Sequence, residues 1–180
     1  QEVLCAYNTA MHEVQTGLHE LLGHGSGKLF TRNEKGAFNF DKENTVDVLT
    51  GGKVKSWYEP GQSYYSVFGD LAKPFEECRA MAVAYVLCCD EEVLELMGYE
   101  CEEGQSVKYA IWLRHMRDGL RALPKYVPSV KSWGTEAHSH ARFVLMKVLL
   151  EAGEECLVID ETVDSDGNTD LIVNLDKSKI

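Results

Sequence analysis

The sequence predicts a mainly α-helical protein with small β elements, of the α+β class. Over most of the chain, apolar residues recur at helical spacing, in segments separated by glycine, proline and capping residues. The tail differs, because two short apolar runs flank the turn-forming residues 164–168, a pattern typical of a β-hairpin. At 180 residues, the chain is predicted to be a single domain, residues 1–180, that can bury its own core.

The first predicted element is a long helix near the start of the chain. The apolar residues that define its period are Val3, Leu4, Tyr7, Met11, Val14, Leu18, Leu21 and Leu22. We expect Gly25 and Gly27 to end this helix. Residues 28–62 are predicted to be irregular, with short extended pieces at 28–31 and 37–40 and a turn at 51–52.

The remainder of the chain is predicted to be helical up to the hairpin. The expected elements are helices at 63–71, 74–89, 91–97, 105–123 and 132–153, then strands at 157–159 and 171–173. Pro74 suits the first turn of the second of these helices. Asp90 is expected to cap the brief third helix, and Gly98 to end it.

The composition limits the partners and the compartment that are expected. A formal net charge of −11 argues against nucleic acid as a partner, and no apolar run is long enough to span a membrane. Of the six cysteines, Cys88 and Cys89 are adjacent, and none has the paired spacing of metal ligands. We therefore expect reduced thiols and a cytoplasmic location.

The strongest functional signal is the segment 19–24, with the sequence HELLGH. Two histidines with a glutamate directly after the first are typical of a helical zinc site, where the imidazoles bind the metal and the glutamate acts on a metal-bound water. On a regular helix, the five-residue step from His19 to His24 turns the side chain by about 140°. The spacing therefore predicts one wide turn of the π type, with Gly23 best able to accommodate it.

A catalytic zinc site usually has three protein ligands and an open position for water. The candidate for the third ligand is Glu77, in the sequence EECRA at 76–80, near the start of an apolar helical run. At a helix N-terminus the dipole is expected to keep Glu76 and Glu77 ionised, which is the state a metal ligand needs.

Together these two segments are similar to the paired signature of the dipeptidyl peptidase III family, zinc exopeptidases that release dipeptides from peptide N-termini. The resemblance covers essentially the whole chain, and further similar segments are 25–30, 34–41, 56–58, 141–143, 149–154 and 176–180. It implies that the chain is the helical zinc-binding lobe of a longer, two-lobed enzyme whose second lobe is missing here. Such a fragment is expected to fold but to be nearly inactive alone.

The resemblance implies a role for each residue of the two segments. His19, His24 and Glu77 are expected to bind one zinc ion, and Glu20 is expected to be the general base. Glu76 resembles the family carboxylate that holds a zinc histidine, which is expected to be His24.

His138 and Arg142 lie four residues apart, on one face of a predicted helix. The segment 136–142 is similar to one in which the family has a histidine that stabilises the transition state and an arginine that helps to bind peptide. The resemblance implies these roles for the pair, with short peptides as substrates. The other histidines have no such counterpart and are interpreted as structural or surface residues: His12, His115 and His140.

The chain departs from the family pattern at two places. Met81 stands where the family has an acidic residue. The stretch 63–66 lacks the Trp-Asp pair that better-known members have at the corresponding place, so Tyr64 and Tyr65 leave the substrate preference open. The alternative is a non-catalytic zinc- or peptide-binding relative; Glu20 argues against it, because a structural metal site needs no general base. An ordinary helical zinc endopeptidase is disfavoured by the five-residue spacing and the paired glutamates.

Overall fold

The computed structural model describes residues 2–153 and 155–180. The chain forms two compact units, one from Gln1–Gly25 with Lys73–Ile180 and the other from Ser26–Ala72, which are described separately. The predicted class is confirmed, since the described residues are mainly helical and their one sheet is a pair of antiparallel strands. Within those ranges, no helix combines the length and the apolar character that a membrane span requires.

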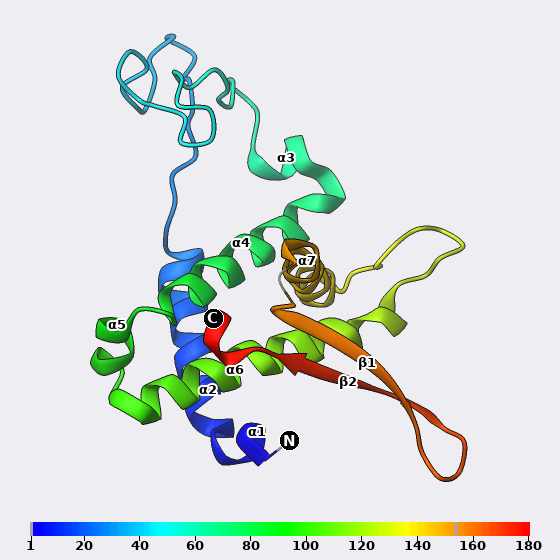
Figure 1. Ribbon diagram of the computed structural model, residues 1–180. Helices are drawn as coiled ribbons and strands as arrows, with labels where there is room; N and C mark the ends of the chain where they lie inside the picture. The colour runs from blue at the N-terminus through cyan, green and yellow to red at the C-terminus, as the bar shows by residue number, and fades with distance from the viewer. Residues whose placement is uncertain (1, 154) are drawn as a thin grey trace. The chain divides into compact units, whose positions relative to one another are not determined.

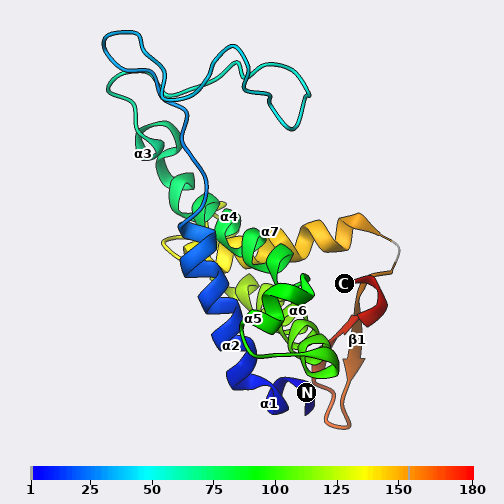
Figure 2. The ribbon, with the colours of Figure 1, turned by 90° about the vertical axis from the view of Figure 1, so that its left-hand side faces the viewer.

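The first unit is a group of helices arranged around α6 (Figure 1). Its helices are α1 (Glu2–Ala6), α2 (Asn8–Gly17), a π-helix (Leu18–His24), α4 (Ala72–Leu87), α5 (Glu91–Leu96), α6 (Cys101–Ala122) and α7 (Ala137–Ala152). The 22-residue α6 contacts α1, α2, α5, α7 and the strand β2 (Thr169–Leu175). In the side view, α6 lies between α2 and the strands (Figure 2).

The brief helix predicted after Asp90 is α5. The Asp90 carboxylate accepts the backbone N–H of Glu92 at 3.0 Å and so caps the helix. The chain leaves α5 at Gly98, whose φ of +90° is a left-handed conformation that glycine adopts without strain. Both capping predictions are therefore confirmed.

Two helices begin at other residues than the helical spacing of apolar residues predicted. Helix α6 begins earlier, at Cys101, because Glu100 is already extended and serves as its N-cap residue. Helix α7 begins later, at Ala137. Ahead of it, Val127 and Ser132 exchange backbone hydrogen bonds of 2.8 and 3.3 Å, which close a loop that ends at Ser132, the residue where the helix was predicted to begin.

The C-terminal hairpin is confirmed. Strand β1 (Leu157–Val163) pairs antiparallel with β2, with Leu157 opposite Leu175. In the turn between them, the Asp164 carboxylate accepts the backbone N–H of Asn168 at 2.8 Å. A short acidic side chain that bonds its own following backbone is a common way to close such a turn.

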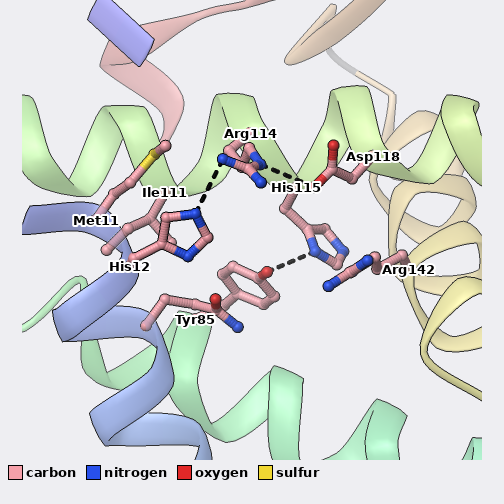
Figure 3. Close-up of a pocket in the computed structure, with 9 residues that line it drawn as sticks. Met11, His12, Tyr85, Ile111, Arg114, His115, Asp118 and Arg142 are labelled. Atoms are coloured by element: carbon pink, nitrogen blue, oxygen red, sulfur yellow. Dashed lines mark hydrogen bonds and ion pairs between the residues drawn. The ribbon is translucent and has the colours of Figure 1, made fainter. Parts of the chain in front are cut away.

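A small pocket lies inside the first unit, between α2, α4, α6 and α7 (Figure 3). Its lining residues are Met11, His12, Gln15, Tyr85, Ile111, Arg114, His115, Asp118 and Arg142. Most of them are polar or charged, although the pocket borders the hydrophobic core.

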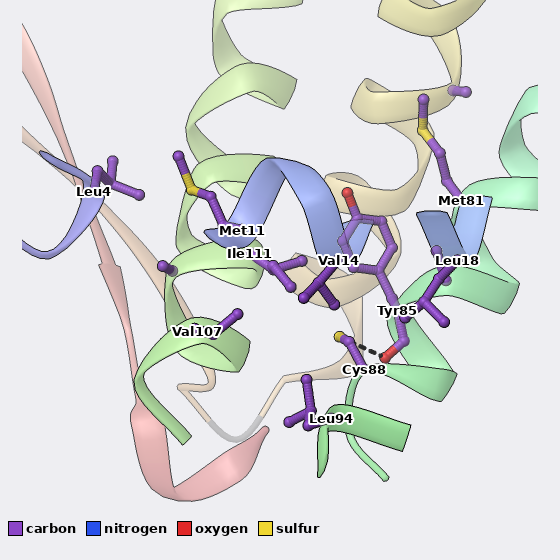
Figure 4. Close-up of a cluster of buried hydrophobic side chains, with 13 residues drawn as sticks. Leu4, Met11, Val14, Leu18, Met81, Tyr85, Cys88, Leu94, Val107 and Ile111 are labelled. Atoms are coloured by element: carbon purple, nitrogen blue, oxygen red, sulfur yellow. Dashed lines mark hydrogen bonds between the residues drawn. The ribbon is translucent and has the colours of Figure 1, made fainter. Parts of the chain in front are cut away.

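The core of the first unit consists of two clusters of buried side chains. The larger joins the helices to one another (Figure 4), through Leu4, Met11, Val14, Leu18, Met81, Ala84, Tyr85, Cys88, Leu94, Val107, Ala110, Ile111 and Ala141. The smaller joins α6 and α7 to the hairpin, through Met116, Met146, Cys156, Leu157 and Leu175. Full burial of a side chain such as Val14 stabilises the fold by roughly 1.5–3 kcal/mol, so these clusters hold α2, α4 and α7 in place around the polar residues between them.

The second unit has little regular structure, as predicted for most of it. Isolated bridges link Thr31 with Tyr58, Arg32 with Phe38, and Val46 with Lys53. Its helix α3 (Tyr64–Phe68) is capped by Ser63, whose hydroxyl accepts the backbone N–H of Ser66 at 3.1 Å. A 3-10 turn, Gly69–Leu71, follows α3.

Candidate metal centre

The motif at 19–24 lies in the π-helix Leu18–His24, which continues α2. A π-helix bonds each residue to the fifth one along, so a five-residue step returns a side chain to the same face. The imidazoles of His19 and His24 accordingly come together, with ring centroids 4.7 Å apart. The predicted wide turn is confirmed.

Gly23 is required for packing as well as for the turn. This buried residue lies against α4, where a Cβ would be 2.7 Å from the carbonyl oxygen of Ala80 and 2.9 Å from its Cα. Both atoms belong to the backbone, so neither can swing aside. The prediction that Gly23 relieves the backbone was therefore incomplete, because glycine also sets how closely the π-helix approaches α4.

We expect Gly23→Ala to lower the free energy of unfolding by about 1–3 kcal/mol, the usual effect of overpacking a rigid contact. Urea denaturation of the full-length protein measures this. Gly17→Ala is the matched control, because the nearest atom to its added Cβ is the flexible Met97 Cε at 3.2 Å. Equal stability of the two variants would contradict the close-packing argument.

Glu77 of α4 completes a group of three possible metal ligands. One nitrogen each of His19 and His24 and one oxygen of Glu77 lie within 4.8 Å of one another. Glu77 Oε2 is 3.2 Å from His19 Nε2 and 3.7 Å from His24 Nε2. This oxygen is buried and accepts no well-formed hydrogen bond from the described residues, which is unfavourable for a carboxylate oxygen unless a cation binds it. Two imidazoles and a carboxylate suit a transition metal such as zinc.

His138 of α7 joins this group from a third element. Its Nε2 lies 3.1 Å from Glu77 Oε2, so three imidazoles surround one carboxylate oxygen. The His138 and His19 ring centroids are 6.3 Å apart, and the His138 side chain is 56% exposed. The structure thus brings His138 beside the candidate metal ligands while leaving it accessible to a substrate.

Glu20 lies at the exposed edge of the group. Its Oε1 is 4.0 Å from His19 Nε2, and its side chain is 61% exposed. A carboxylate in this place can reach a small molecule bound next to the imidazoles and can accept a proton from it.

Glu76 and Glu77 lie farther from the helix N-terminus than predicted. Helix α4 begins at Ala72 and has no acidic residue in its first turn, where the dipole acts most strongly, so that part of the prediction was wrong. Neighbouring side chains act on Glu76 instead. Arg79 donates hydrogen bonds of 2.9 and 2.6 Å to it, and these bonds, with that to His24, hold the pKa of Glu76 below its usual value.

The expected contact between Glu76 and His24 is present. His24 Nδ1 lies 3.0 Å from Glu76 Oε1, while Nε2 of the same ring faces Glu77. A carboxylate that accepts the Nδ1 proton orients the ring and leaves the other nitrogen free to bind a metal.

His19 has no carboxylate among the described residues that accepts its Nδ1 proton and orients its ring. The residue is 5% exposed, and burial lowers the pKa of His19 despite the opposing effect of the Glu77 carboxylate. Its Nδ1 is buried and has no hydrogen-bond partner in the described ranges. Met81, one turn after Glu77 on α4, is 1% exposed and packs in the core. Because a thioether is at best a weak acceptor, it cannot replace the acidic residue expected from the resemblance.

Arg142 is placed apart from the metal group. It follows His138 by one turn on α7, but its guanidinium lines the pocket of Figure 3, beside Tyr85 and His115. Its role in binding peptide stays a prediction. His140, interpreted as a structural residue, stacks on Trp133 with ring centroids 5.2 Å apart.

The Tyr85–His115 pair was missed by sequence reasoning. The Tyr85 hydroxyl lies 2.5 Å from His115 Nδ1, and the two residues are 5% and 3% exposed. Burial lowers the pKa of His115 to about 3, with the Arg142 charge lowering it further and Asp118 opposing. No local signal marks this pair, because its members lie on different helices, 30 residues apart.

We expect the neutral His115 to make the protein less stable in mild acid. An exposed imidazole in the unfolded chain binds a proton near pH 6.5, whereas the folded one does so only near pH 3. The contribution is therefore complete above pH 6.5 and is lost as the pH falls, at up to about 1.4 kcal/mol per pH unit. The charged or titratable groups that line the pocket with this ring are Tyr85 on α4, Arg114 and Asp118 on α6, Arg142 on α7 and His12 on α2.

The measurement is the free energy of unfolding at pH 7 and pH 5, compared with that of His115→Gln, which cannot take up the proton. Other acid-sensitive groups contribute equally to both proteins. The unmodified protein should lose about 2 kcal/mol more than the variant between these values. If the free energy of unfolding fell equally in the two proteins, His115 would not titrate as described.

Comparisons with known proteins bear on this geometry. The model of peptidase family M49 matches residues 1–180. The chain belongs to peptidase family M49. Its M49 relatives include dipeptidyl peptidase 3 of Mus musculus and of Homo sapiens, each 50% identical over 168 residues, which is 93% of this chain. Dipeptidyl peptidase 3 of Dictyostelium discoideum is 38% identical over an alignment of 188 positions that covers the whole chain.

The M49 chain spans about a quarter of the length of these relatives, 23% of the mouse and human proteins and 26% of the Dictyostelium protein.

Proposed function

We propose that the full-length protein containing this M49 chain is a zinc-dependent dipeptidyl peptidase, which releases dipeptides from the N-termini of short peptides. The observation that carries the proposal is the convergence of His19, His24 and Glu77, with the Glu20 carboxylate at their exposed edge. The substrate class comes from the relatives named dipeptidyl peptidase 3.

In this proposal His19 and His24 hold one zinc ion through Nε2, together with the carboxylate of Glu77. Bound zinc would polarise the scissile carbonyl and lower the pKa of the attacking water. Glu20 takes the proton of that water and passes it to the leaving amine. Its high exposure leaves the carboxylate free to move between these two positions.

The neighbouring residues orient the reacting groups. Glu76 holds the His24 ring through Nδ1. His138, accessible and beside the ligands, donates a hydrogen bond to the oxygen that becomes negative in the transition state. Arg142 is assigned to peptide binding on the resemblance alone.

The proposed partners are short peptides and a second lobe, which the family resemblance places in a part of the full-length protein outside this chain. The cleft needs that second wall to position a peptide, so the isolated chain should be nearly inactive. A cytoplasmic location is proposed from the thiols, since Cys5 and Cys101 are exposed without a disulfide.

A second candidate function is a non-catalytic zinc-binding relative. It is favoured by the unsupported Nδ1 of His19 and by Met81 in place of an acid. The presence of Glu20 at the exposed edge argues for catalysis, since a purely structural site has no use for a base there.

The test is hydrolysis of dipeptidyl naphthylamides and short peptides by the full-length protein. Under the proposal, dipeptides are released from free N-termini, a zinc chelator abolishes the reaction, and added zinc restores it. Internal cleavage of N-acetylated peptides would instead indicate an endopeptidase. Zinc bound without any hydrolysis would support the non-catalytic relative.

A further inference from the structure

The pocket between α2, α4, α6 and α7 lies apart from the residues proposed to hold zinc (Figure 3). None of its described lining residues belongs to the group of His19, His24 and Glu77. Its volume is about 40 Å³, more than the roughly 10–15 Å³ that one water molecule needs. It is too small for a peptide residue, so its occupant must be a small molecule or a single ion.

The hydrogen bond between Tyr85 and His115 determines what the imidazole offers to this pocket. Burial raises the pKa of Tyr85, so the phenol keeps its proton and donates it to Nδ1 of His115. The neutral ring then carries its one N–H at Nε2. That nitrogen is buried without a hydrogen-bond partner among the described residues. An N–H donor without an acceptor is unfavourable in such a place.

The charges around the pocket are unbalanced. Asp118, the one carboxylate in its described lining, lies 2.9 Å from Arg114 Nε and 3.6 Å from Arg117 Nη2. Arg114 Nη1 is also 3.2 Å from His12 Nε2. The guanidinium of Arg142, beside the His115 ring in Figure 3, has no carboxylate partner among the described residues. The pocket therefore carries an excess of positive charge and of hydrogen-bond donors.

We propose that this pocket binds a small monovalent anion of halide size, such as chloride, between the Nε2–H of His115 and the guanidinium of Arg142. An anion accepts both donors and compensates the charge of Arg142, which a water molecule cannot do. Because α7 carries both Arg142 and His138, the bound anion would fix this helix against α4 and α6. The site is separate from the metal group, and the inference does not depend on the proposed peptidase function.

The direct test is anomalous diffraction from crystals of the full-length protein soaked in sodium bromide. A bromine peak is expected within hydrogen-bond distance of both His115 Nε2 and the Arg142 guanidinium. The proposal is overturned if bromine peaks occur elsewhere on the protein while this pocket holds only water.

A second test measures the melting temperature against chloride concentration, with gluconate keeping the ionic strength constant. A saturable rise is expected for the unmodified protein. Loss of one charge-assisted hydrogen bond should weaken the chloride affinity about tenfold or more in His115→Leu and in Arg142→Gln. His115→Gln, which keeps an amide donor, should retain part of the response.

His140→Gln is the matched control, because it removes an α7 imidazole that stacks on Trp133 outside the pocket. It should respond to chloride like the unmodified protein. An equal chloride response in His115→Leu, Arg142→Gln and His140→Gln would overturn the proposal, since the effect would then be a general salt effect.

Discussion

Glu20→Gln in the full-length protein is expected to keep its zinc and to lose nearly all turnover. Glutamine has almost the same shape as glutamate, but its amide cannot accept a proton from the attacking water. Loss of a general base typically lowers the rate about 10²–10⁴-fold. Glu20 lies beside His19 Nε2 at 4.0 Å but is not one of the three converging residues, so metal binding should survive. The measurements are kcat on a dipeptidyl naphthylamide and the zinc content of the purified variant.

Glu13→Gln is the control for the change of charge, because Glu13 is an exposed glutamate of the preceding helix α2. It should keep normal turnover. Substantial activity in Glu20→Gln would show that another group is the base. Loss of zinc from that variant would instead mean that Glu20 helps to hold the metal.

The convergence of the two histidines could be predicted from local sequence alone. A five-residue step has one simple helical solution, the π turn, so the spacing of His19 and His24 determined their geometry. The caps and breakers were equally local signals, and Asp90 and Gly98 act where they were expected to act. Such features depend on neighbouring residues, which a sequence displays directly.

Contacts between distant segments could not be predicted in this way. His138 reaches Glu77 because α7 and α4 share a core, and Gly23 is needed because the π-helix packs on α4. The Tyr85–His115 bond likewise joins two helices. Side-chain packing between helices sets these contacts, and periodicity within one helix carries no information about them. The family resemblance identified His138 as a candidate site residue, but it did not predict that His138 lies beside Glu77.

The prediction that the helix dipole keeps Glu76 and Glu77 ionised was wrong, because the first residue of the helix was misplaced. Pro74 is tolerated anywhere in the first turn, so it did not determine the first residue, which is Ala72. Because the helix begins at Ala72 and not at Pro74, both carboxylates lie past its first turn. The ionised state of Glu76 depends on Arg79 and His24 instead.

Met81→Glu is expected to bind zinc about 10–100-fold more tightly than the unmodified protein, the usual effect of a hydrogen-bonded carboxylate behind a metal-binding histidine. His24 already has such a partner in Glu76, whereas His19 Nδ1 is buried without one. Position 81 follows Glu77 by one turn, so its side chain projects from the same face of α4. A glutamate there can accept the Nδ1 proton and fix the ring with Nε2 toward the metal.

The same substitution should destabilise the metal-free protein, because position 81 is 1% exposed and a buried carboxylate is unfavourable until it is paired. Zinc should restore the stability. Competition against a chromogenic chelator measures the affinity, and Met81→Leu, which keeps the volume without adding an acceptor, is the matched control with unchanged affinity. If Met81→Glu bound zinc no more tightly than Met81→Leu, His19 would be held adequately without any carboxylate at position 81, and the departure from the family pattern would have no effect on the metal.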